Sequence, residues 1–285
     1  VIYLSLYGVK TDKFNKEIIK NVSKINKKIN LSLNEVNYLL NPLNFSINIS
    51  TKNPKILLED KSLDLKDITS NISIKSFISN QFSIDDLKIS TKEIKIKDLI
   101  SLTRAVEGSP QLFVLDSITK EGLISTNINL KFDLDGEIKN NYQITGTVKK
   151  AKFNIFNKVE IDDLNLSFNI SNNQLTLKKI ETNLNSIKLK SPLIKIEKKK
   201  DIFFVDGEVA NEEQNFDINK LKPIFGDLPN NIEIEKIDFN SVNIFSFNVN
   251  KKLKLNNLKL ETNLNLENFQ IVKNPLNLKT FLPNY

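Results

Sequence analysis

Most of the chain alternates apolar and polar residues with a period of two, which is the spacing of a half-buried β-strand. Clear examples are the segments 29–33, 43–50, 124–134 and 164–170. Turn sequences such as Asp135-Gly136 separate the strands. Strict alternation gives each strand one apolar face and one solvent-exposed polar face. The chain is therefore expected to be mostly antiparallel β.

A short phrase interrupts this alternation at four places. It reads FSIDDLKIS at 82–90, VEIDDLNLS at 159–167 and LKLNNLKLE at 253–261, with a looser copy, IEIEKIDFN, at 232–240. One extra polar residue would turn every later apolar side chain to the wrong face unless the strand absorbs it. A β-bulge absorbs it, and bends and twists the strand. We therefore predict bulges at the paired residues DD, NN and EK, and a sheet that curls.

The N-terminal part follows other patterns. Residues 1–9 carry no charge and are too few to cross a bilayer, which takes about 20 residues, so they fit either the end of a transmembrane helix or a buried first strand. Residues 10–29 predict an amphipathic helix with lysines on another face. This helix is expected to pack on the end of the sheet, to lie on an anionic membrane, or both. Its apolar stripe consists of Phe14, Ile18, Val22, Ile25 and Ile29.

Three later stretches lack the period of two, and we predict that they are insertions that cap or brace the sheet. The stretch 97–118 predicts a short helix, a turn at Gly108–Pro110 and a second apolar piece. The stretch 217–229 predicts a short helix interrupted near Pro223, and the stretch 274–283 has no clear period.

The amino-acid composition limits the classes of function that the chain could have. The chain has 285 residues, 40% of them hydrophobic, which suits one long domain with a sizeable core. Its net charge of +7 is carried by lysines spread over polar strand positions, and Arg104 is the only arginine. This pattern is typical of a solvated face rather than a nucleic-acid site, which uses arginines and stacked aromatic residues. Because methionine is absent even at position 1, we expect a fragment of a longer protein.

The sequence offers few residues suited to catalysis or to metal binding. The chain contains no cysteine and no histidine, so it lacks thiolate chemistry and the commonest general base and metal ligand. The pairs Asp85-Asp86 and Asp162-Asp163 suggest acid–base or metal chemistry at first sight, but neighbouring strand residues point to opposite faces. Other copies of the phrase carry Asn256-Asn257 and Glu235-Lys236 instead. We therefore expect no catalytic residue, no metal, no cofactor and no enzyme activity.

The order of these features resembles the AsmA-like family, whose members, TamB and YhdP among them, are large periplasmic proteins anchored in the inner membrane of Gram-negative bacteria. The likeness rests on the uncharged run, the basic helix and the segment INLSLNEVNYLLNPLNFSINISTKNPKI. Within that segment, the family pattern L-x-P-x-x-F-x-I falls on Leu40, Pro42, Phe45 and Ile47. The bulged phrase at 82–90 also resembles the family's repeats.

The resemblance implies a long, curled antiparallel sheet that forms an open groove. Residues 1–9 would end a transmembrane anchor, 10–29 would form the amphipathic helix, and 30–285 would form a truncated β-groove domain. The implied function is phospholipid transport between the inner and outer membranes, in support of envelope integrity and outer-membrane biogenesis. The implied partners are phospholipid acyl chains, the inner membrane, and outer-membrane or envelope proteins, with no nucleic acid.

The apolar residues that share one phase within each strand are the candidate lipid-binding residues. An open groove would present them to acyl chains, whereas a structural or adhesive β-protein would seal them in a closed core, and both arrangements bury them. The candidates are Phe45, Ile47, Ile49, Ile84, Ile128, Leu130, Phe132, Leu164, Leu166, Phe168, Leu258 and Leu260.

Overall fold

The computed structural model describes residues 2–13, 15, 16, 19, 30–58, 61–79, 84–106, 109–155, 159–185, 187–212, 233–250 and 254–273. Most of the amphipathic helix expected at 10–29 lies outside these residues. The stretches 217–229 and 274–283 lie wholly outside them.

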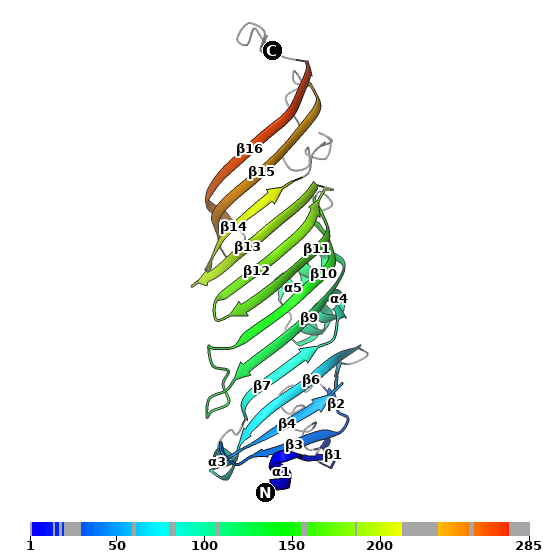
Figure 1. Cartoon of the computed structure of the whole chain (residues 1–285), viewed down its shortest axis with the longest axis vertical. Coiled ribbons are helices and arrows are strands. Elements are labelled where there is room, and N and C mark those ends of the chain that lie inside the picture. Colours follow the sequence, from blue (N-terminus) through cyan, green and yellow to red (C-terminus); the bar gives the residue numbers. More distant parts are fainter. Residues whose placement is uncertain are drawn as a thin grey trace. The chain divides into compact units, whose positions relative to one another are not determined.

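The described residues form mostly β-strands, joined in one large antiparallel sheet of 16 strands that stays open (Figure 1). The expected fold class, mostly β with an open antiparallel sheet and few helices, is confirmed. Strands follow one another along the sheet almost in chain order, as the alternating pattern and short turns predict. The main path runs through β1 (Val9–Thr11), β3 (Val36–Asn41), β4 (Ser46–Lys52), β6 (Lys61–Ser73), β7 (Ile84–Thr91), β9 (Thr119–Lys131), β10 (Gln143–Ile155), β11 (Val159–Ser171), β12 (Gln174–Leu184), β13 (Ile187–Lys199), β14 (Ile202–Asn211), β15 (Glu233–Asn250) and β16 (Leu255–Lys273).

Three short strands lie off this path. Strand β2 (Asn30–Ser32) pairs with β5 (Lys55–Leu58), and β5 pairs in turn with the first half of β6. Strand β8 (Ile94–Lys95) pairs with β9.

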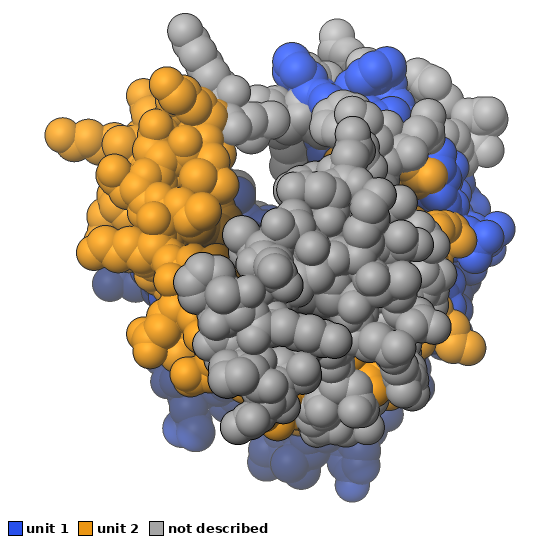
Figure 2. Space-filling model, turned by 90° about the horizontal axis from the view of Figure 1, so that it is seen from above, with its two compact units in different colours: residues 1–149, 167–175 blue, residues 150–166, 176–285 orange. Residues whose placement is uncertain are grey.

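The chain divides into two compact units (Figure 2). Unit 1 comprises Val1–Lys149 and Ser167–Leu175, and unit 2 comprises Lys150–Leu166 and Thr176–Tyr285.

Three of the four predicted bulges are present in the strand register. Along β7, Asn71 pairs with Asp86 and Ile72 pairs with Ile84, so Asp85 is the extra residue. The same analysis of β15 and β16 places one extra residue at Glu235 and another at 257–258. In the remaining copy, Asp163 has the left-handed φ of 49°, a conformation that an L-residue adopts at a G1-type bulge.

One other strand prediction needs correction. The segment 43–50 was expected to be one strand, but residues 42–45 form a turn and β4 begins at Ser46. The side-chain oxygen of Asn41 accepts a hydrogen bond from the backbone N–H of Asn44 at 3.2 Å, which stabilises the turn. Pro192 lies inside β13, where the register shifts between Lys190 and Ile194; a bulge tolerates its missing N–H.

Four helices are described. Helix α1 (Ile2–Leu6) is short and has no buried residue, so the buried-strand alternative for residues 1–9 is wrong. Helix α3 is Ile74–Ile78. The insertion expected at 97–118 is confirmed as α4 (Ile96–Val106) and α5 (Pro110–Ile118), the second capped by Ser109.

Helix α4 packs on the sheet of unit 1 and completes a small core. Buried Leu63, Leu65 and Ile94 form the centre of this core, and Leu99 and Leu102 of α4 pack against it. Apolar strand residues surround them: Ile56, Ile68, Ile89 and Ile124.

Candidate functional site: an apolar sheet face

The cross-strand register of unit 1 aligns apolar side chains into rows on one face of the sheet. Residues directly opposite each other on paired strands project from the same face. The first row is Leu40, Ile47, Ile72 and Ile84; the second is Tyr38, Ile49, Ser70, Leu87 and Leu130; the third is Val36, Thr51, Ile68, Ile89 and Ile128. These three rows are called the unit 1 apolar face, and all members except the buried Val36 and Thr51 are only half-buried.

Helix α4 covers only one end of this face. Ile68 and Ile89, in the third row, pack against the core beneath the helix, whereas the first two rows do not belong to that core. The side chains of these rows therefore keep part of their apolar surface accessible.

The opposite face of the same strands is polar. Asn48 donates a hydrogen bond from Nδ2 to Oδ1 of Asn71 at 2.8 Å, and Asn71 donates from Nδ2 to Oδ2 of Asp86 at 2.7 Å. This chain of side chains crosses β4, β6 and β7. The sheet of unit 1 is thus amphipathic, as the alternating sequence predicts.

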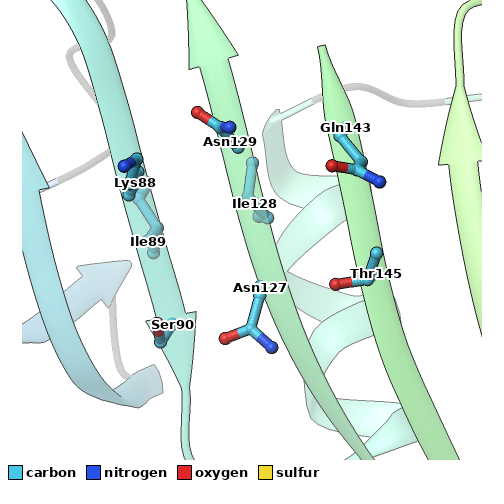
Figure 3. Close-up of a pocket in the computed structure, with 8 residues that line it drawn as sticks. All are labelled: Lys88, Ile89, Ser90, Asn127, Ile128, Asn129, Gln143 and Thr145. Carbon is cyan, nitrogen blue, oxygen red and sulfur yellow. The ribbon is translucent and has the colours of Figure 1, made fainter.

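The described depressions lie on polar surface. One, of about 260 Å³, runs over β7, β9 and β10, where polar side chains of Lys88, Asn127, Asn129 and Gln143 line it (Figure 3). The other is lined by Asn140, Tyr142, Asn172 and Asn173. Neither of these two depressions is an enclosed apolar cavity.

Unit 2 has an apolar face of its own. Gly207 of β14 lies opposite Ile194 and Phe245, and Val205 lies opposite Phe247. The rings of Phe245 and Phe247 stack with centroids 5.9 Å apart. Together these residues form the unit 2 apolar face, which consists of Ile194, Ile196, Phe203, Val205, Phe245, Phe247 and Leu260.

Five predicted site residues lie together. Ile47, Ile49, Ile84, Ile128 and Leu130 all belong to the unit 1 apolar face, which confirms that they share one side of the sheet.

The prediction for Phe45 is wrong in its structural part. Its side chain is 69% exposed and its φ is 47°, because the turn after Asn41 takes Phe45 out of the strand. Phe132 lies just beyond β9, where it forms an isolated bridge with Ile138 and is half-buried.

The other predicted residues lie on β11 and β16. Leu164, Leu166 and Phe168 occupy alternate, half-buried positions of β11. Leu260 lies opposite Phe245, and Leu258 is part of the bulge at 257–258; their side chains are 61% and 56% exposed.

The sequence analysis did not select several members of these faces. Tyr38 and Leu40 are hidden in the run YLL, where three consecutive apolar residues obscure the period. Ile72, Leu87 and Phe245 follow the same alternation as the selected residues, so that signal was available for them.

The paired acids contribute to sheet structure. The ammonium group of Lys152 lies 2.7 Å from Glu160 and 2.9 Å from Asp162. Hydrogen bonds to Glu160 and then to Asp162 raise the pKa of the Lys152 ammonium group. Asp86 accepts the hydrogen bond from Asn71, and the exposed Asp85 accepts one through its carbonyl from the N–H of Phe132.

The described residues also bear on metal binding and on membrane crossing. Within them, no group of three or more His, Cys, Asp or Glu side chains is placed to hold a metal ion. No helix in the same residues has the length and hydrophobicity needed to cross a bilayer.

Comparison with known proteins adds no assignment. No family model matches the chain, and no curated protein or solved structure matches it.

Proposed function

We propose that the apolar faces of this open sheet bind the acyl chains of phospholipids, and that the protein supports lipid movement between the membranes of a bacterial envelope. The observation that carries the proposal is the alignment of half-buried Ile, Leu and Tyr side chains in rows across β3, β4, β6, β7 and β9. Large accessible apolar patches on a folded protein favour a ligand or a partner.

The energetics suit acyl chains. Each methylene group moved from water onto an apolar surface contributes about 0.8 kcal/mol when fully buried. Neighbouring strands lie about 4.8 Å apart, so a row that crosses four or five strands is roughly 14–19 Å long. That length is close to half of the roughly 30 Å hydrocarbon core of a bilayer, which one layer of acyl chains fills. The polar face behind the rows keeps the sheet hydrated, which leaves only one side for the lipid.

The cellular setting is part of the same proposal. The resemblance to AsmA-like proteins supports a periplasmic location with attachment to the inner membrane, and contacts with outer-membrane or envelope proteins. The alternative, a structural or adhesive β-protein, would need its apolar face covered by a second layer.

Leu130 provides the test. Leu130 lies opposite Leu87 on the unit 1 apolar face, and Leu130→Asp places a carboxylate at the β9 end of its second row. We expect the variant to fold, because the charge stays near water, and to lose most of the phospholipid that co-purifies with the unaltered protein. The matched control is Asn127→Asp, on the exposed polar face of the same strand, which should retain the lipid.

Lipid is extracted from each purified protein and identified by mass spectrometry, and folding is followed by circular dichroism. Unaltered protein that carries no phospholipid would overturn the proposal. Unfolding of Leu130→Asp, with Asn127→Asp folded, would favour the closed core, since an unpaired buried charge costs several kcal/mol.

A further inference from the structure

A polar belt crosses the unit 2 apolar face on three adjacent strands. Asn211 of β14 lies opposite Ser241 of β15, and Asn243 of β15 lies opposite Thr262 of β16. These four residues, called the polar belt, lie on the same side of the sheet as Phe245, because residues two apart in a strand share a face. The belt therefore adjoins apolar surface along each strand.

Two backbone carbonyl groups fix the direction of the hydrogen bonds in the belt. Asn211 Nδ2 donates to the carbonyl of Phe239 at 3.1 Å, and Asn243 Nδ2 donates to the carbonyl of Val209 at 3.2 Å. A carbonyl only accepts, so both amide orientations are determined. Ser241 then donates to Asn211 Oδ1 at 2.5 Å and accepts from Asn243 Nδ2 at 2.9 Å.

Thr262 completes the network. Its hydroxyl donates to Asn243 Oδ1 at 2.9 Å. Both amide hydrogens of Asn243 and the single hydroxyl hydrogen of Thr262 are now engaged, whereas both oxygens keep lone pairs. Asn211 and Ser241 are each only 5% exposed, so ligands can reach the belt at Asn243, which is half-buried, and at Thr262, which is exposed. The accessible part of the belt offers acceptors and no donor.

We propose that the polar belt accepts hydrogen bonds from the headgroup of a lipid whose acyl chains lie on the adjoining unit 2 apolar face. Neighbouring same-face positions are about 7 Å apart along a strand, so one amphiphile reaches Phe245 and the belt together. Headgroups with ammonium or hydroxyl hydrogens fit this site, whereas a trimethylammonium headgroup has no hydrogen to donate. This inference rests on the proposed function, because it names the lipid class that the apolar face selects.

The experiment compares two net-neutral lipids with identical short acyl chains, phosphatidylethanolamine and phosphatidylcholine, as monomers in solution. Dissociation constants come from native mass spectrometry of the full chain. We expect phosphatidylethanolamine to bind about two- to tenfold more tightly, the ratio expected from a single net hydrogen bond. Thr262→Lys replaces an acceptor with an ammonium group and should bring the ratio to about one, while Thr262→Ser keeps the hydroxyl and the preference.

Asn263→Lys is the matched control, because it adds the same charge at the neighbouring exposed residue on the opposite face. It should keep the preference. Equal binding of the two lipids by the unaltered protein, or an equal loss of preference in both lysine variants, would overturn the headgroup inference and leave the proposed function standing. Failure to bind either lipid would overturn the proposed function itself.

Discussion

Two glycines allow aromatic rings to lie flat on the sheet. A Cβ atom on Gly146 would lie 2.3 Å from the backbone oxygen of Ser125 and 2.5 Å from Cζ of Phe168. A Cβ atom on Gly207 would lie 2.8 Å from Cζ of Phe245, where only side chains need to move. An aromatic ring over a strand glycine compensates for the packing that the glycine lacks. The two sites differ in whether backbone blocks a larger residue.

Gly146→Ala should therefore destabilise the protein more than Gly207→Ala. We expect a loss of about 1–3 kcal/mol in the free energy of unfolding for Gly146→Ala, the range for overpacked sites, and a smaller loss for Gly207→Ala, because the ring of Phe245 can shift. Urea denaturation of both variants measures the difference. Equal losses, or the reverse order, would contradict this reading of the two glycines.

At the scale of the element, bulges keep the apolar side chains of a long strand on one face of the sheet. Asp163 adopts a φ of 49°, and Asn165 donates a hydrogen bond from Nδ2 to the carbonyl of Asp163 at 2.8 Å. Asn257, at the equivalent place in β16, has a φ of 53°. Aspartate and asparagine tolerate the left-handed conformation better than other residues with a Cβ atom. Backbone conformation thus explains the second residue of the pair in two copies of the repeated phrase, Asp163 and Asn257.

Asp163→Val should destabilise the protein by about 1–2 kcal/mol more than Asp163→Gly, because a β-branched residue resists positive φ and glycine does not. Both substitutions remove the same carboxylate, so the difference between them isolates the backbone term. Thermal or urea unfolding of the pair provides the measurement. A valine variant as stable as the glycine variant would show that β11 carries no left-handed residue at this position.

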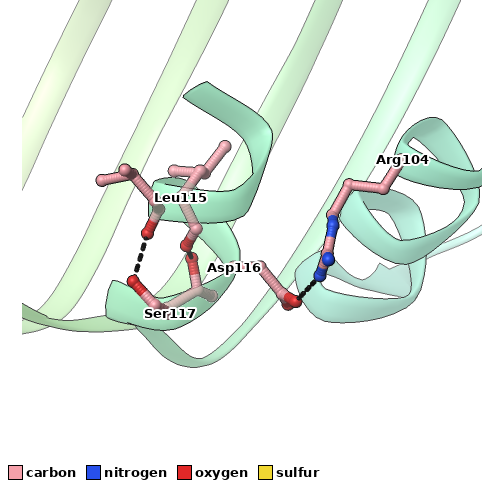
Figure 4. A network of polar contacts seen from close by, with 6 residues as sticks. Arg104, Leu115, Asp116 and Ser117 are labelled. Carbon is pink, nitrogen blue, oxygen red and sulfur yellow. Dashed lines mark hydrogen bonds and ion pairs between the residues drawn. The ribbon is translucent and has the colours of Figure 1, made fainter. Parts of the chain in front are cut away.

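At the scale of the whole molecule, the sheet remains open and leaves apolar rows accessible. In the described residues, the small core under α4 is the main place where helix and sheet bury side chains together. The helical pair itself is held by an ion pair between Arg104 and Asp116 (Figure 4). The guanidinium group of Arg104 lies 5.2 Å from the ring centroid of Phe113. The side chains of Phe113, Val114 and Leu115 on α5 are exposed.

The folded protein should bind an environment-sensitive naphthalene sulfonate dye under native conditions, and oleic acid should displace the dye. The reason is that apolar surface is accessible without unfolding, unlike in a closed β-sandwich. Leu130→Asp should lower the signal and Asn127→Asp should not. Dye fluorescence that rises only as the protein unfolds would mean that the apolar face is covered in solution.

The sequence by itself determined the local features. Periods of two and of three to four residues predicted strands and the α4–α5 insertion, since each reflects the geometry of one element. The repeated phrase predicted bulges, because one extra residue has only that local solution. It also placed Ile128 and Leu130 on one face, since faces follow from alternation within a single strand.

Tertiary structure alone decided what depends on distant residues. Phe45 lies outside its strand because pairing of β4 with β6 begins only at Ser46, opposite Ser73. The rows, and the contact between Asn243 and Thr262, depend on register between strands, which no single segment encodes. Packing between elements far apart in the chain decides whether an apolar face is covered. The sequence cannot decide this, because a strand in an open sheet and a strand in a closed core have the same alternating pattern of apolar and polar residues.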